Sequence, residues 1–228
     1  MGRVRVHQHV NPLSPHYLQE PLAIELADVF ADPTKPLLLD IGCARGRFLL
    51  KMAELEPEWN FLGVEIRQPL VGEANRLADE ALLSNLHYTF CNAMLFLDKL
   101  IADIPSELLQ KVTIQFPDPW FKKRHAKRRM VNAELVKAVV DRLAPSGQIF
   151  IQTDIEELSI EMFELFRAEP RVFEVKIVEN PFPVKTEREK AVLDRELSVY
   201  RALFKDIFKL SANSRQPKQK STSRFSLS

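Results

Sequence analysis

The stretch PLLLDIGCARGRF, residues 36–48, decides the fold. Its apolar run is short enough for a buried strand, and Gly42 and Gly46 place a tight loop directly after it. From residue 47 to 55 the apolar residues take helical spacing, which stops at Pro57. A strand, a glycine-bearing loop and a helix in that order predict the start of a βαβ unit, the building block of a parallel sheet.

The same alternation continues along the chain. Further strands are expected at 61–66, 86–91, 112–116, 148–153, 173–178 and 199–204, and helices near 21–30 and at 70–83, 94–101, 132–143 and 156–167. Strands that alternate with helices predict a doubly wound α/β fold, with a mostly parallel seven-stranded sheet and helices on both faces. In such a Rossmann-like sheet the ligand crevice lies beyond the carboxyl ends of the strands.

Length and composition fit one folded domain with an extension at each end. The chain has 228 residues, of which 46% are hydrophobic and 28% charged, so a sizeable core is available. We expect an irregular arm at residues 1–20, the folded domain at 21–210 and a disordered basic tail at 211–228. The tail contains almost no large apolar residues and is therefore expected to be dispensable for folding.

We expect no membrane span, no metal site and a cytoplasmic location. No apolar run approaches the ~20 residues that a bilayer span needs, and the first residues lack the apolar segment of a signal peptide. Cys43 and Cys91 form no CxxC pair and fit buried thiols in a reducing compartment. The histidines form no metal-ligand set with these cysteines. The sequence favours neither a monomer nor a homodimer.

Charge is distributed unevenly along the chain. The net charge of +1 includes four basic residues in the tail, without which 28 basic residues face 31 acidic ones. Against this slightly acidic body, residues 122–129 (KKRHAKRR) contain six permanent cations. Such a run is often only a solvated face, but one attached to a rigid loop at a strand end favours contact with a nucleic acid.

Polar residues follow five of the expected strands. They are Asp40, Glu65, Asn92 with Ala93, Asp118 and Asp154. Because the carboxyl ends of parallel strands meet at one edge, we expect these side chains to gather at the crevice. Glu65 lies nineteen residues after Gly46, close to the interval at which such folds place an acid on ribose hydroxyls. The alternative is that the glycines merely permit a tight turn and that Glu65 is solvated.

Two cofactor classes share this arrangement of loop and acid. A dinucleotide presents a pyrophosphate to the loop, and a carboxylate such as Asp40 would repel it. S-adenosyl-L-methionine carries no phosphate, and its cationic amino and sulfonium groups favour nearby carboxylates. The acidic crevice therefore favours S-adenosyl-L-methionine, with an NAD-dependent oxidoreductase as one alternative and a non-catalytic RNA-binding module as another.

A stiff loop precedes the basic run. In FPDPWFKKRH, residues 116–125, the prolines on either side of Asp118 restrict the backbone and hold Asp118 and Trp120 at the crevice rim. A carboxylate pocket is thus bordered by cations that can bind phosphates. Trp120 either stacks on a base or fills the apolar underside of the loop.

With these features together, the chain resembles the bacterial single-subunit family of tRNA (guanine-N7-)-methyltransferases. The resemblance extends from residue 9 to about 204 and rests on HVNPL (9–13), DIGCARGRF (40–48), GVEI (63–66), FPDPWFKKRHAKRRM (116–130), QTD (152–154) and TERE (186–189). Two positions depart from the commonest pattern, since Ala44 stands where glycine is usual and Asp40 where many members have glutamate. The extra methyl group at Ala44 narrows the loop and bears on cofactor affinity.

The resemblance implies transfer of a methyl group from S-adenosyl-L-methionine to N7 of a guanosine in the variable loop of tRNA. It implies cofactor contacts for Asp40, Glu65, Asn92 and Asp118, with Asp118 central to catalysis. Gly42, Gly46 and Ala93 complete the cofactor site that we predict.

The resemblance also implies that Lys122, Asp154 and the residues Thr186, Glu187, Arg188 and Glu189 contact tRNA. The basic run adds Lys123, Arg124, Arg128 and Arg129 to the predicted tRNA surface. Thr186 and Glu189 also fit a T-x-x-E capping box at the start of a helix, and both roles can hold together.

Overall fold

The computed structural model describes residues 10–120 and 123–207. Its strands are β1 (Leu37–Ile41), β2 (Asn60–Glu65), β3 (Leu86–Phe90), β4 (Leu109–Gln115), β5 (Gln148–Thr153), β6 (Val172–Val175) and β7 (Tyr200–Asp206). Its α-helices are α1 (Leu26–Val29), α2 (Arg47–Leu55), α3 (Gln68–Glu80), α4 (Ala93–Leu100), α5 (Ala133–Arg142), α6 (Glu156–Arg167) and α7 (Glu187–Leu193). Two 3₁₀ helices complete the series, η1 (Pro15–Tyr17) and η2 (Lys123–Arg128).

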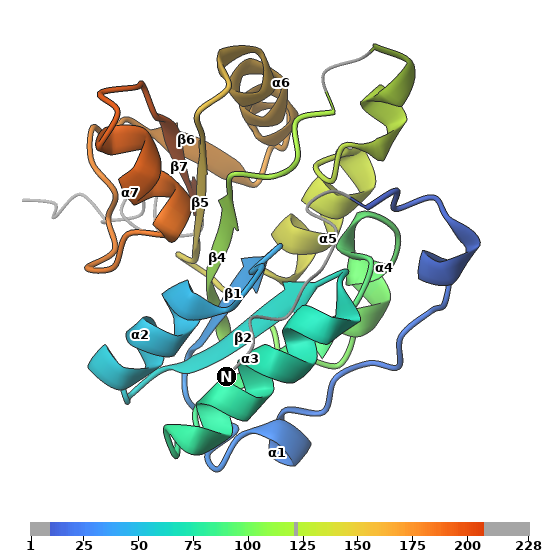
Figure 1. Cartoon of the computed structure of the whole chain (residues 1–228), viewed down its shortest axis with the longest axis vertical. Coiled ribbons are helices and arrows are strands. Elements are labelled where there is room, and N and C mark those ends of the chain that lie inside the picture. The colour runs from blue at the N-terminus through green and yellow to red at the C-terminus, as the bar shows by residue number, and fades with distance from the viewer. Residues whose placement is uncertain (1–9, 121–122, 208–228) are drawn as a thin grey trace, which may run out of the picture.

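The seven strands form a single sheet in the order β3-β2-β1-β4-β5-β7-β6 (Figure 1). Strands β1 to β5 pair in parallel, and β7 pairs antiparallel with both β5 and β6. The predicted doubly wound, mostly parallel sheet of seven strands is therefore confirmed. Among the described helices, none is long and apolar enough to span a bilayer.

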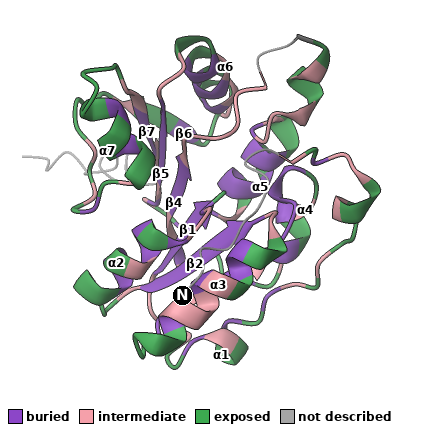
Figure 2. Ribbon diagram, viewed as in Figure 1, coloured by how far each residue is buried: buried purple, intermediate pink, exposed green. Residues whose placement is uncertain are grey.

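Strand β1 shows why the sheet is covered on both faces. Leu37, Leu39 and Ile41 lie in a core shared with α4, α5 and α6, whereas Leu38 lies in a second core with α2 and α3. Successive side chains of a strand point to opposite faces, so a strand buried on both sides needs a continuous apolar run. Figure 2 shows the buried strands between helices whose outer surfaces are exposed.

The helix expected near residues 21–30 is wrong in extent, because α1 has only four residues. The segment before it is extended, and its Ile24 N–H donates to the Leu100 carbonyl at 2.9 Å. Ile24, Leu26 and Phe30 are all buried in the core that contains α4. Packing against the sheet therefore outweighs the local helical pattern.

Gly63 in β2 lets a tyrosine on the neighbouring strand reach the glycine loop. A Cβ atom at Gly63 would lie 2.4 Å from Tyr88 Cδ1 and 2.8 Å from Cys43 Sγ. The Tyr88 hydroxyl donates to the Gly46 carbonyl at 2.6 Å, and the ring is almost completely buried. Tyr88 thus supports the loop from below only because position 63 has no side chain.

This arrangement predicts opposite effects for two glycine substitutions. Gly63→Ala should lower the free energy of unfolding by on the order of 1–3 kcal/mol, because the new methyl group displaces Tyr88 and Cys43. Gly72→Ala is the matched control, since nothing lies within 4 Å of its Cβ position in α3. It should raise the free energy of unfolding by about 0.5–1 kcal/mol. Urea unfolding of both variants measures this, and equal effects would contradict the packing argument.

Candidate functional site

A cavity of about 1080 Å³ opens at the carboxyl ends of the parallel strands. The predicted cofactor residues among its walls are Asp40, Gly42, Glu65, Asn92, Ala93 and Asp118. The predicted tRNA residues among its walls are Arg128, Asp154, Thr186, Glu187 and Arg188. The topology therefore brings both predicted groups to one cavity, as expected for a parallel sheet.

Several predicted residues lie elsewhere. Gly46 is buried beneath the loop, with its carbonyl bonded to Tyr88, and does not line the cavity. Arg124, Arg129 and Glu189 also lie outside the lining. Lys122 and the side chain of Lys123 fall outside the described residues, as does the whole tail at 211–228.

The glycine loop has an alternating left-handed backbone. The φ angles are +81° at Gly42, +52° at Ala44 and +71° at Gly46. Gly42 and Gly46 tolerate this conformation, whereas at Ala44 the side chain adds roughly 1–2 kcal/mol of strain. The departure from glycine at position 44 therefore places backbone strain in the loop.

Glu65 joins this loop to the end of β2. Its Oε2 accepts the backbone N–H of Ala44 at 2.9 Å, and its Oε1 accepts the backbone N–H of Arg67 at 3.0 Å. The Arg67 guanidinium bonds both carboxylate oxygens, at 2.7 Å through Nε and 3.1 Å through Nη2. Glu65 is only 3% exposed, so the solvated-surface alternative is excluded.

The pKa of Arg67 is also affected by Asp118, the predicted catalytic acid. Burial opposes its charged form, but the hydrogen bonds and charge of Glu65, together with the charge of Asp118, raise the pKa of Arg67 overall. The guanidinium is therefore a fixed cation between the acid of β2 and the loop after β4. The sequence analysis did not single out Arg67, although its place two residues after Glu65 is visible in the sequence.

Asp40 is a second deeply buried acid of the cavity wall. It is 4% exposed, and its Oδ1 accepts the Thr113 hydroxyl at 2.6 Å. Burial raises the pKa of Asp40 to about 6, a rise that Thr113 and Gln115 partly oppose and Glu65 increases.

Asn92 connects the cavity to the N-terminal segment. Its Nδ2 donates to the carbonyls of Pro12 at 2.8 Å and Tyr17 at 3.1 Å, which fixes that segment across the cavity. Val10 and Pro12 accordingly line the wall. The HVNPL stretch already suggested that this segment matters, but the sequence could not show that Asn92 holds it.

The loop that carries Asp118 is strained on both sides. Phe116 has a φ angle of +52° and Trp120 one of +43°, both unusual for residues with side chains. The Arg129 Nε donates to the Pro119 carbonyl at 3.1 Å, and Arg129 also pairs with Glu161 of α6. Strained backbone persists where surrounding contacts hold it, and it is concentrated at functional sites.

Trp120 lies beneath the basic run. The Arg128 guanidinium lies 5.1 Å from the centre of the Trp120 ring, and the His125 ring meets it edge-on at 5.7 Å. Trp120 is half-buried and lines the cavity. Both roles considered for it, stacking on a base and filling the loop, fit this position.

The start of helix α7 lines the cavity beside the first residue of α2. Thr186 caps it by accepting the Glu189 N–H at 3.1 Å, which confirms half of the predicted capping box. Glu187 pairs with Arg47 of α2, and Arg188 pairs with Asp154 after β5. The Glu189 side chain does not return to the cap; it is 0% exposed and bonds to the sheet.

Both cysteines are buried in the structure. Cys43 and Cys91 are free and buried, and burial raises the pKa of Cys91 to about 12, so they are the buried thiols that we predicted. Within residues 10–120 and 123–207, no group of three or more His, Cys, Asp or Glu side chains is placed to hold a metal ion.

Comparison with known proteins identifies close relatives. A family model described as "Putative methyltransferase" matches residues 34–202. A tRNA (guanine-N(7)-)-methyltransferase of Synechococcus elongatus is 55% identical, covering 90% of this chain and 97% of the relative. The enzyme of the same name from Trichormus variabilis is 53% identical over the same shares. The solved antibiotic-resistance methyltransferase Kmr has a TM-score of 0.51 at 16% identity, covering 78% of this chain and 87% of that one, which supports the fold alone.

The burial of Asp40 predicts a pH dependence of stability. Its pKa is 3.8 when solvated and about 6 when folded, so its contribution to stability is lost as the pH rises through this interval. Asp40→Asn keeps the acceptor for Thr113 without the charge. It should raise the free energy of unfolding at neutral pH by up to about 3 kcal/mol and change it little near pH 4. Urea unfolding at several pH values measures this, and a pH-independent difference would contradict it.

Proposed function

Since the chain belongs to the tRNA (guanine-N(7)-)-methyltransferase family, we propose that its cavity binds S-adenosyl-L-methionine and a tRNA guanosine side by side. The enzyme methylates N7 of a guanosine in tRNA, and the variable loop is the target that we propose. The observation that carries the proposal is the joint placement of Glu65, Asp118 and Arg188 around one cavity.

The cavity fits the charge of the cofactor. The carboxylates of Asp40 and Asp118 line the cavity and suit a ligand whose amino and sulfonium groups are cationic, whereas the charge of Glu65 is balanced by Arg67. The left-handed glycine loop exposes backbone close to the cavity at Gly42. When bound, S-adenosyl-L-methionine supplies an electrophilic methyl group. Glu65 is the residue that we propose for its ribose hydroxyls, with Arg67 fixing the carboxylate orientation.

The reaction requires little acid–base catalysis by the protein. Guanine N7 carries a lone pair and no proton, so no general base is needed to expose the nucleophile. Alignment of the base is then the main requirement. Positive charge develops on the purine during transfer, and the Asp118 carboxylate stabilises it and orients the base. The prolines and contacts of its loop keep Asp118 from moving away.

The tRNA surface that we propose combines the basic run with α7. The deep, narrow major groove of A-form RNA hides N7, so the target guanosine belongs to a loop or a tertiary contact. Lys127 and Arg124 are exposed, and Arg188 lies half-exposed at the cavity rim. These cations reach phosphates of a strand that enters the cavity. A cytoplasmic location, where tRNA is modified, belongs to the same proposal.

The two alternatives are not favoured. An NAD-dependent oxidoreductase would place a pyrophosphate near the buried Asp40, and the family of the chain is one of methyltransferases. A non-catalytic RNA-binding module would need neither the buried pair of Glu65 and Arg67 nor a strained loop around Asp118. Thermal shift with S-adenosyl-L-methionine and with NAD distinguishes all three, since only the first ligand should stabilise the protein.

Asp118→Asn should separate catalysis from binding. The amide keeps the shape of the side chain but cannot stabilise positive charge, so we expect methyl transfer to fall on the order of 100-fold or more. Binding of tRNA should change little. Labelled S-adenosyl-L-methionine with unmodified tRNA, followed by nucleoside analysis, measures both the product and its rate. Near wild-type turnover at saturating substrates would remove Asp118 from the mechanism.

The basic run should contain residues of two kinds. Lys127 is exposed, so Lys127→Ala should reduce the slope of log affinity against log salt by about 0.7–0.9 and leave stability unchanged. Arg129 bonds Glu161 and Pro119, so Arg129→Ala should lower the free energy of unfolding by on the order of 1 kcal/mol. Fluorescence titration of tRNA at several salt concentrations, with melting curves, compares them. A lower slope for both variants alike would show that Arg129 also contacts tRNA.

A further inference from the structure

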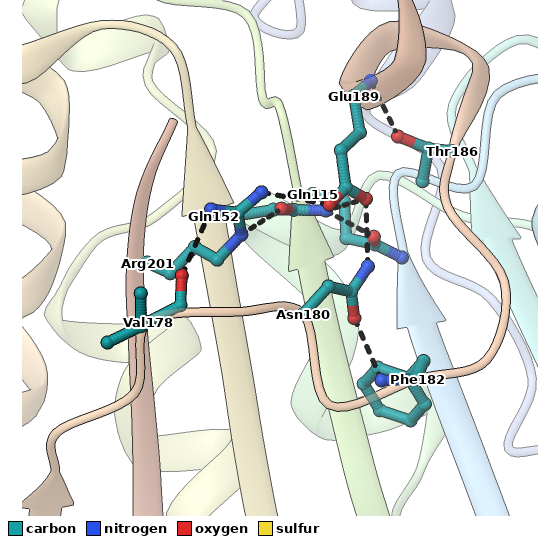
Figure 3. A network of polar contacts seen from close by, with 8 residues as sticks. All are labelled: Gln115, Gln152, Val178, Asn180, Phe182, Thr186, Glu189 and Arg201. Atoms are coloured by element: carbon teal, nitrogen blue, oxygen red, sulfur yellow. Dashed lines mark hydrogen bonds and ion pairs between the residues drawn. The ribbon is translucent and has the colours of Figure 1, made fainter. Parts of the chain in front are cut away.

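We propose that Arg201 and Gln152, which lie behind the cavity wall, are positioning residues that hold α7 in the place where it contacts tRNA. The inference rests on the proposed function, because it assigns a purpose to the same rim of the cavity. It concerns the polar network of Figure 3, whose centre is the buried carboxylate of Glu189.

All the hydrogen bonds of the Glu189 carboxylate lead into the protein interior. Its Oε1 accepts from Arg201 Nη2 at 2.9 Å, and its Oε2 accepts from Asn180 Nδ2 at 2.8 Å and Gln152 Nε2 at 3.1 Å. The side chain is 0% exposed, and that of Arg201 is 11% exposed. In this position Glu189 cannot reach a tRNA, so the role that we propose for it is indirect.

The network forms a row across three strands. Gln115 of β4 is the register partner of Gln152 in β5, and Gln152 is the register partner of Arg201 in β7. Gln152 Nε2 donates to Gln115 Oε1 at 2.8 Å, while its Oε1 accepts from Arg201 Nε at 3.2 Å. Gln115 lines the cavity three residues before Asp118. The same row therefore supports α7 and the strand that leads to the catalytic loop.

Helix α7 depends on this row for its position. It has seven residues, which is too short for a helix to be stable on its own. Its outward pair of Glu187 with Arg47 is more than half exposed on both sides and contributes little. Its second pair joins the half-exposed Arg188 to Asp154, whose side chain is 13% exposed. Two residues of the helix are buried, Val192 and Glu189, and Glu189 is the one whose directional hydrogen bonds fix where the first residues of α7 stand on the rim.

Stability alone does not explain a buried ion pair here. Replacing such a pair by packed apolar residues is often neutral or stabilising, whereas directional hydrogen bonds fix a geometry. Asn180 extends the hydrogen-bond network to the segment before α7, because its Oδ1 accepts the Phe182 N–H at 2.9 Å. A positioning role predicts a defect in tRNA recognition beyond any loss of stability.

Arg201→Met tests the inference against a matched control, Arg171→Met. Arg171 Nη2 also lies 2.9 Å from a buried acid of β7, Asp206, but at the strand end away from the cavity. At a temperature where circular dichroism shows both variants folded, Arg201→Met should raise the KM for tRNA about fivefold or more. Its dissociation constant for S-adenosyl-L-methionine should stay close to that of the wild type. Arg171→Met should change neither quantity.

Two further measurements make the outcome decisive. Arg201→Lys keeps a cation for Glu189 and should recover part of the lost tRNA affinity, which a purely steric role would not predict. Fluorescence anisotropy with tRNA measures binding without turnover, so an inactive wild type would refute the proposed function and leave this inference testable. Equal KM changes in Arg201→Met and Arg171→Met, or a parallel loss of cofactor affinity, would overturn the positioning role.

Discussion

The burial of three carboxylates at one edge of the sheet is the constraint on which the site depends. Asp40, Glu65 and Glu189 are each at most 4% exposed. A buried charge is tolerated only with partners, and each acid has a different one: a hydroxyl for Asp40, a guanidinium with backbone amides for Glu65, and an arginine with two amides for Glu189. These partners fix the glycine loop, the end of β2 and α7 against one cavity.

The fold was predictable because a parallel sheet covered by helices on both faces produces recognisable local patterns of apolar residues. Runs such as PLLLDI stay apolar on both faces, and the helices between them repeat every three or four residues. The helix predicted near residues 21–30 was wrong because contacts distant in sequence, and not the local pattern, decide the structure there. Leu26 and Phe30 are spaced as if for a helix, yet they are buried with Ile24 in the core that contains α4, which lies far away in the sequence.

The candidate site was predictable where topology alone decides it. Strand ends converge whatever the register, so Asp40, Glu65 and Asp118 could be placed together from the sequence. The row formed by Gln115, Gln152 and Arg201 could not, because it requires the register of an antiparallel strand inserted between β5 and β6. The sequence also could not show where the Glu189 side chain points, because a T-x-x-E pattern indicates where a helix begins but not which residues the acid contacts.

Helix α7 has two kinds of ion pair: exposed pairs at the cavity rim, which can change partners, and a buried pair behind the rim, which cannot. Arg47 and Arg188 are half-exposed at the rim, and the pair of Arg47 with the exposed Glu187 contributes little net free energy. A phosphate can therefore replace an acid as partner at small cost, and the counterions released from the RNA favour the exchange. Glu189 and Arg201 are shielded from solvent and keep their pairing while this happens. In the tRNA-binding role proposed for α7, the exposed pairs can change partners while the buried pair keeps the helix in its place.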